Sequence, residues 1–120
     1  MAHPPGFPAR RAALTLIDGV LHRGEVLDRI LPRAARGLSP SDTQLARAIA
    51  SETLRWLADL DALVDSATKK RLPDDAKARS VLRLMLVQVL RLDTPPHAVI
   101  ATALPLLAGG PRRLAHGVFG

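Results

Sequence analysis

Two pairs of arginines lie close to the start of predicted helices, where their chemistry suits an anion. Each pair follows closely on a proline, a residue favoured at the first position of a helix. Both pairs should therefore lie near the positive end of a helix dipole, where each cation costs about 0.3–1 kcal/mol. A phosphate would offset that cost, because helix-start N–H groups and guanidinium groups both bind phosphate oxygens. We expect phosphate contacts from Arg10, Arg11, Arg112 and Arg113, unless these are simply solvated surface arginines.

A further basic stretch, TKKRLPDD, has the composition of a loop that ends at Pro73. Three consecutive cations in this loop form a candidate secondary site for the same anion: Lys69, Lys70 and Arg71. Four histidines are spread along the chain without the spacing of metal ligands, and His97 and His116 have no nucleophile or orienting carboxylate nearby in sequence. The chain has no cysteine, which excludes disulfides, thiolate metal sites and cysteine nucleophiles. We therefore predict no catalytic residue, no metal site and no cofactor.

The charge of the chain is large and unevenly distributed. Seventeen basic residues stand against 11 acidic ones, a net charge of +6, which favours a polyanionic partner such as nucleic acid. Residues 38–68 carry two basic and five acidic side chains, whereas residues 69–92 carry seven basic and two acidic ones. The alternative is that these segments neutralise one another across helix contacts.

The elements that must position these residues are predicted to be helices. Apolar residues recur at three- and four-residue spacing over 8–23, 25–36, 39–68 and 76–92, and no segment alternates with period two. The fold class is therefore all-α. Gly24 should end the first helix, and Ser39 should cap the helix that follows Gly37. Trp56 should be a core anchor, because it falls on the apolar face of the 39–68 helix.

The segment 76–92 is apolar over most of its circumference, which predicts a central helix opened by Asp74 and Asp75. Its only charged arc is narrow and carries Arg79, Arg83 and Arg91. Another helix should begin near Pro96 and be kinked or split by Pro105, because an interior proline removes a hydrogen bond. A last helix should begin at Pro111.

The whole chain, residues 1–120, is predicted to form one domain, with residues 1–8 flexible. The apolar pattern of the last helix is still running at Gly120, so we expect the chain to be part of a longer protein. No apolar run is long enough to span a membrane, and the N-terminus lacks the apolar region of a secretory signal. We therefore expect a cytoplasmic protein with no membrane partner.

Several stretches in order resemble one family: ARRAAL, LSPSDTQLARAIASETLRWLADLDALV, LRLMLVQVLRLDTPPHAVI and LAHGVF. They resemble the NusB fold, and most closely the N-terminal domain of the bacterial ribosomal RNA cytosine-5 methyltransferases called Sun or Fmu. The resemblance implies a NusB-like bundle of about six to seven helices. Where this family often has Asn-Glu the chain has Ala101 and Thr102, Pro105 replaces a frequent Glu, and His116 replaces a typical Asn. Roles of those polar residues are not carried over.

The resemblance implies a binding and positioning domain of an S-adenosylmethionine-dependent 16S rRNA cytosine-5 methyltransferase. The chain itself would not be an enzyme, because it lacks the cysteine nucleophile and the glycine-bearing cofactor turn of such enzymes. The seven basic residues named above would then contact ribosomal RNA, and the C-terminal methyltransferase domain would be a further partner. Two alternatives remain: a NusB-type antitermination factor, or a protein-interaction module that docks on its own catalytic domain or on an acidic partner.

Overall fold

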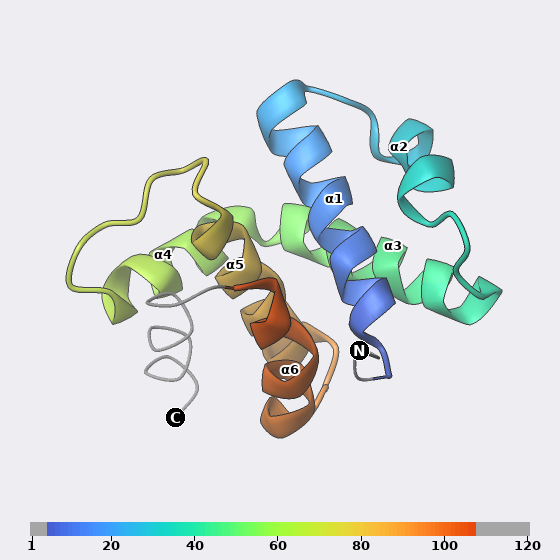
Figure 1. Ribbon diagram of the computed structural model, residues 1–120. Helices are drawn as coiled ribbons and strands as arrows, with labels where there is room; N and C mark the ends of the chain where they lie inside the picture. Colours follow the sequence, from blue (N-terminus) through green and yellow to red (C-terminus); the bar gives the residue numbers. More distant parts are fainter. Residues whose placement is uncertain (1–4, 108–120) are drawn as a thin grey trace.

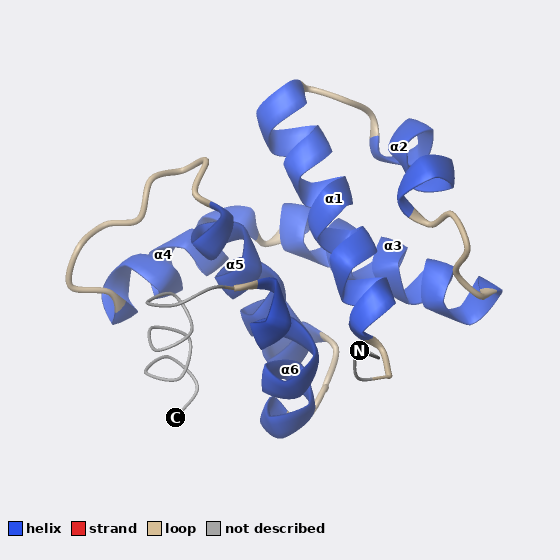
Figure 2. Cartoon of the chain, viewed as in Figure 1, coloured by secondary structure: helices blue, strands red, loops and turns tan. Residues whose placement is uncertain are grey.

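The computed structural model describes residues 5–107 as a bundle of helices (Figure 1). Their bounds in chain order are α1 Phe7–Arg23, α2 Leu27–Ala34, α3 Pro40–Arg55, α4 Leu57–Ala67, α5 Lys77–Arg91 and α6 Pro96–Ala103, followed by a 3₁₀ turn, Leu104–Leu106. The described part of the chain contains no strand (Figure 2), which confirms the all-α class. None of its helices could cross a membrane. The predicted helix from Pro111 lies outside the described residues.

A glycine with positive φ lies at each end of α1. Gly6, at φ 87°, precedes α1, and Phe7 and Pro8 form its first turn although both were expected to belong to a flexible end. Gly24, at φ 64°, donates its N–H to the carbonyl of Gly19, which confirms the predicted end of the helix. Gly19 faces α2 closely, since a Cβ atom there would lie 2.5 Å from Cδ1 of Ile30.

The long helix predicted over 39–68 is two helices. Ser39 caps α3 as predicted, because its Oγ accepts a hydrogen bond from the N–H of Asp42 at 3.1 Å. Trp56, at φ −105° and ψ 22°, separates α3 from α4. The break separates two halves with different main partners: α3 lies mainly against α1 and also contacts α5, whereas α4 lies against α5.

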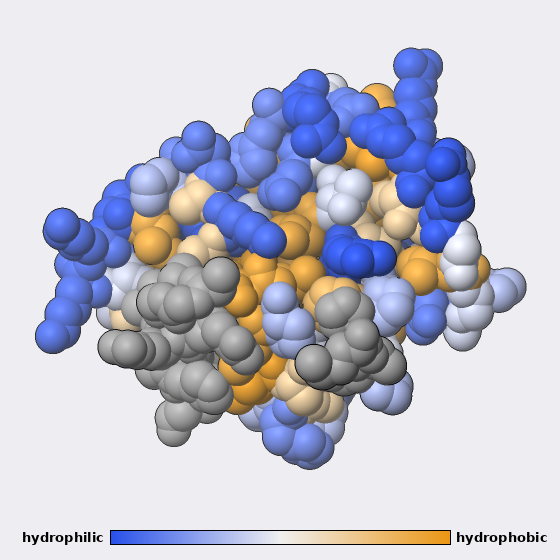
Figure 3. All heavy atoms as spheres, viewed as in Figure 1, coloured by the Kyte–Doolittle hydropathy of each residue, from blue (hydrophilic) through white to orange (hydrophobic). Residues whose placement is uncertain are grey.

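The central position predicted for the 76–92 helix is confirmed. Helix α5 packs against α1, α3, α4 and α6 (Figure 1), and most of its apolar residues are buried, although Leu90 near its end is exposed. The core that surrounds it includes Leu16 and Ile17 of α1, Ile49 of α3, Leu60 of α4 and Val99 of α6. On the face drawn in Figure 3, hydrophobic side chains gather in the middle and hydrophilic ones cover the upper edge.

Three local expectations have mixed outcomes. Pro96 does begin α6, and Pro105 lies in the 3₁₀ turn that ends it, so the predicted split is confirmed. Asp74 and Asp75 do not open α5, whose N-cap is Ala76, but form a turn before it. Trp56 packs against the core as predicted, but it is only partly buried and so is not a fully buried anchor.

Candidate nucleic-acid interface

The two arginines at the start of α1 lie in opposite environments. Arg11 is exposed, with its guanidinium 5.7 Å from the ring centroid of Phe7. Arg10 is 8% exposed, and its Nε donates a hydrogen bond to Oε1 of buried Gln88 on α5 at 2.9 Å. Its Nη1 donates to the carbonyl of Gly6 at 3.3 Å. The expectation that Arg10 is available at the surface was therefore wrong.

The physical reason for the burial of Arg10 is its place on the helix. Ala13, Leu14 and Ile17 follow it at spacings of three, four and seven, so Arg10 shares the buried face of α1. Burial lowers the pKa of Arg10, and the nearby carboxylate of Asp42 offsets this only in part. The structure therefore uses this cation to join α1 to α5.

The loop between α4 and α5 supplies exposed cations that have no polar partner in the described part of the chain. Lys69 and Lys70 are both exposed, and neither takes part in a hydrogen bond or ion pair there. Arg71 differs, because its Nη2 lies 2.6 Å from Oδ1 of Asp74 and its Nε lies 4.0 Å from Oδ2 of Asp65. The hydrogen bond from Arg71 lowers the pKa of Asp74. Of the three predicted loop cations, two are free and one is paired.

The predicted pair Arg112 and Arg113 lies outside the described residues, so its phosphate contacts stay a prediction. Within the described chain the predicted residues do not form one cluster. Arg11 belongs to the start of α1, whereas Lys69 and Lys70 belong to the loop between α4 and α5.

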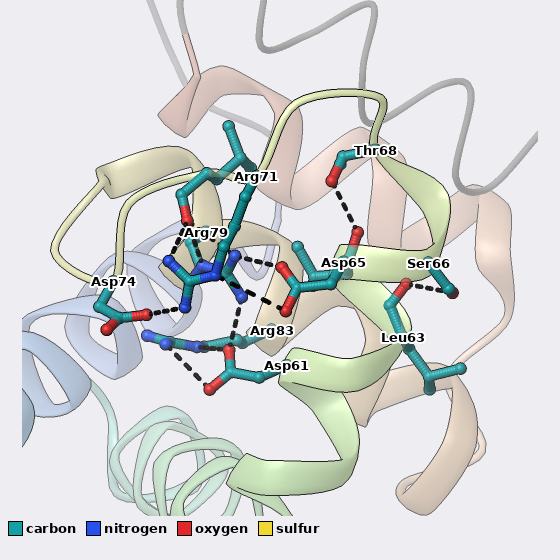
Figure 4. Close-up of polar contacts among 11 residues, drawn as sticks. Asp61, Leu63, Asp65, Ser66, Thr68, Arg71, Asp74, Arg79 and Arg83 are labelled. Atoms are coloured by element: carbon teal, nitrogen blue, oxygen red, sulfur yellow. Dashed lines mark hydrogen bonds and ion pairs between the residues drawn. The ribbon is translucent and has the colours of Figure 1, made fainter.

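Two arginines that sequence reasoning treated as a charged arc are buried in an ion-pair cluster (Figure 4). Arg79 is 0% exposed and donates to Oδ1 of Asp61 at 3.0 Å, to Oδ1 of Asp65, and to the carbonyl of Leu72. Arg83 is 3% exposed and donates from Nε and Nη2 to the two oxygens of Asp61, at 2.7 and 3.2 Å. These contacts join α4 to α5.

The ion pairs set the protonation of the cluster. Burial alone would raise the pKa of Asp61, but the hydrogen bonds from Arg83 and Arg79 outweigh it and hold the pKa below its ordinary value. Burial likewise opposes the charge of Arg79, but its bonds to Asp65 and Asp61 raise its pKa. The acidic segment 38–68 and the basic segment 69–92 were alternatively expected to neutralise one another across helix contacts. That alternative is correct for the ion pairs of this cluster.

A further basic surface lies where α3 ends, and sequence reasoning did not single it out. The guanidinium of Arg91 lies 4.3 Å from the ring centroid of Trp56, and that of Arg55 lies 5.8 Å away. The indole N–H of Trp56 donates to Oε2 of Glu52 at 2.9 Å. Beside them is a shallow groove of about 410 Å³. Its lining comprises Gln44, Arg47, Ala48, Ser51, Glu52 and Leu92. The four-residue spacing of Arg47, Ser51 and Arg55 places them on one face of α3, and this spacing was the signal in the sequence for the basic surface.

Comparison with known proteins places this fold in a family. Residues 8–109 match the NusB family. Among the similar proteins are the ribosomal RNA small subunit methyltransferase B of Escherichia coli O157:H7 (strain EC4115 / EHEC), at 32% identity, and that of Escherichia coli O1:K1 / APEC, at 33%. Each alignment covers 95 residues, which is 77% of this chain and 22% of the relative, so the chain spans about a fifth of the length of these relatives. With a family match over most of its length and helices that agree with it, the chain belongs to the NusB family.

Proposed function

We propose that this chain is the RNA-binding and positioning domain of a 16S rRNA cytosine-5 methyltransferase that uses S-adenosylmethionine and acts in the cytoplasm. The observation that carries the proposal is the similarity over 77% of the chain to proteins named ribosomal RNA small subunit methyltransferase B. The chain spans 22% of those proteins, and we further propose that methyl transfer itself is carried out by a part of the enzyme outside this chain.

The charge distribution supports RNA as the partner. Ion pairs engage many of the basic residues, but Arg11, Lys69 and Lys70 remain exposed and outside any ion pair of the described chain. Such cations bind phosphate without reading sequence, so the domain would add affinity and orientation while base choice comes from elsewhere. Arg10 is left out of this proposal, because its guanidinium is buried against Gln88.

The test is the salt dependence of binding to a structured 16S rRNA fragment. Each phosphate-binding cation that a substitution removes should flatten the plot of log affinity against log salt by about 0.7–0.9. We expect the pair Lys69→Ala/Lys70→Ala, the single Arg11→Ala, and the pair Arg112→Ala/Arg113→Ala each to reduce the slope. Melting temperatures should stay unchanged for the first two, because these substitutions break no ion pair.

A matched control removes the same charge from another surface. Arg29 and Arg36 are likewise exposed and have no ion pair in the described chain, but they belong to α2 and the turn after it, on the other side of the bundle from the loop between α4 and α5 (Figure 1), so Arg29→Ala/Arg36→Ala should keep the wild-type slope. If the three test variants also keep that slope, these residues do not bind RNA, and docking on the catalytic domain or on an acidic protein becomes the better explanation of the basic surface.

A further inference from the structure

A small pocket opens where three helices meet beside the buried ion pairs. Its volume is about 270 Å³, just below the roughly 300–1,000 Å³ of pockets for drug-sized ligands. Helix α1 contributes Leu21 and His22, α4 contributes Leu57 and Asp61, the following loop contributes Asp74, and α5 contributes Arg83. The pocket therefore joins apolar walls to groups that donate and accept hydrogen bonds.

Arg83, which lines this pocket, has one side-chain donor without a partner in the described part of the chain. Its Nε and Nη2 bind Asp61, but its Nη1 is buried and has no hydrogen-bond partner among residues 5–107. In Figure 4 this end of the guanidinium extends beyond Asp61, on the side away from Asp65. A buried donor without a partner is costly and uncommon in folded proteins, and a charged donor is costlier still. An acceptor oxygen that enters the pocket would satisfy it after a small movement of the side chains that cover Nη1.

The charges around the pocket indicate which acceptor fits. Among its lining residues Arg83 stands beside Asp61 and Asp74, and each of the two carboxylates is already paired with an arginine, so the charges around the pocket are close to balanced. A phosphate or carboxylate would therefore find little net attraction here and would lie beside two carboxylates, whereas a neutral ligand avoids that repulsion. Carboxylates also have lone pairs to spare after binding arginine, so they can accept from a ligand N–H. The ligand should be neutral, flat enough for the apolar walls, and equipped with both a carbonyl and an amino group.

We propose that this pocket binds one unpaired base of an RNA strand, a cytosine or a guanine, whose carbonyl accepts from Arg83. This proposal rests on the RNA-binding function proposed above. Arginine is the usual donor to guanine oxygen, and carboxylates accept from the amino group of cytosine. Unpaired bases are the usual targets of specific RNA recognition. The loop that carries Asp74 also carries Lys69 and Lys70, which are free to bind the phosphates of the same strand.

The decisive measurement is methyl NMR of the 120-residue chain during titration with small probes. Cytidine or guanosine should produce saturable shifts of the Leu21 and Leu57 methyl signals, and uridine and adenosine weaker ones. Two further probes test other ligands: N-methylacetamide imitates a peptide group, and inorganic phosphate imitates an anion. The proposal is overturned if no nucleoside shifts these methyl signals, or if N-methylacetamide or phosphate shifts them equally well.

Two variants connect the pocket to RNA binding. His22→Trp should fill the pocket without touching the buried ion pairs, while Ala101→Trp places the same bulk on the exposed side of α6, outside the pocket. We expect His22→Trp to abolish the nucleoside shifts and to weaken binding of the rRNA fragment about tenfold with an unchanged salt slope, whereas Ala101→Trp changes neither. If the two variants changed the nucleoside shifts and the RNA affinity equally, the proposal that this pocket binds a base would be overturned.

The two proposals fail in different ways. Salt-dependent RNA binding without nucleoside shifts overturns the base pocket alone. Absence of RNA binding by the wild-type chain overturns the proposed function, and the base pocket falls with it.

Discussion

Replacing Asp61 with asparagine should remove the charge that holds two buried arginines. Arg79 would keep Asp65, but Arg83, only 3% exposed, would have no carboxylate at all. Breaking one side of a buried ion pair costs about 3–5 kcal/mol, because the remaining charge stays buried and unpaired. Asparagine keeps one oxygen acceptor, so we expect about 3 kcal/mol, which corresponds to a fall in melting temperature on the order of 10 °C.

The assay is urea unfolding at pH 7 followed by far-ultraviolet circular dichroism. Asp59→Asn is the matched control, because Asp59 lies on the same helix but is exposed and has no ion pair within residues 5–107, and it should change stability by less than about 0.5 kcal/mol. The double variant Asp61→Leu/Arg83→Met should recover much of the stability, since it removes both charges together. A cost below about 1 kcal/mol for Asp61→Asn would refute the view that this cluster joins α4 to α5.

The same pair makes stability depend on pH in a predictable direction. The pKa of Asp61 is lower in the folded protein than in the unfolded chain, because Arg83 and Arg79 favour its ionised form despite burial. Its contribution is therefore fully present above the unfolded pKa of about 4 and is lost as the pH falls through the folded pKa. Asp61→Asn should consequently lose less stability than the wild type between pH 5 and pH 2. A parallel decline in both proteins would contradict this assignment.

Three further substitutions test the positions where sequence reasoning and structure differ or agree. Arg10→Ala should destabilise the chain by about 1–3 kcal/mol in urea melts, because it leaves Oε1 of buried Gln88 without its donor; an unchanged or higher melting temperature would mean that Arg10 is exposed. Trp56→Ala should cost about 2 kcal/mol, less than the 3–5 kcal/mol of a fully buried aromatic, and a larger cost would place Trp56 in the core. Ser39→Ala should cost about 1 kcal/mol through loss of the cap on α3, whereas Ser41→Ala, close by and not the cap, should not.

The helix boundaries were largely predictable because their signals are local. Gly24, Ser39 and Pro96 act through their own backbone or side-chain geometry, so the sequence alone indicates where α1 ends and where α3 and α6 begin. The break at Trp56 has no such signal. It follows from the packing of α3 on α1 and of α4 on α5, which is a property of the assembled bundle.

The candidate site was less predictable because burial of a charge depends on distant partners. Arg10 was expected at the surface, yet its partner Gln88 lies 78 residues away. For Arg79 and Arg83 a signal did exist: they are four residues apart, as are Asp61 and Asp65 on the preceding helix. Matched spacing of opposite charges on consecutive helices indicates that the helices can pair along those faces. The exposure of Lys69 and Lys70 agrees with the loop composition.

The hydrogen bond between Arg10 and Gln88 has a consequence for how the chain folds. The contacts of Arg79 and Arg83 with Asp61 close segments of 18 and 22 residues, whereas the contact of Arg10 closes 78. Closing the longer segment costs about 1.3 kcal/mol more chain entropy than closing 18 residues. We therefore expect the hairpin of α4 and α5 to form as a local unit before α1 docks on it. Weakening the hairpin should slow folding, while Arg10→Ala should mainly speed unfolding.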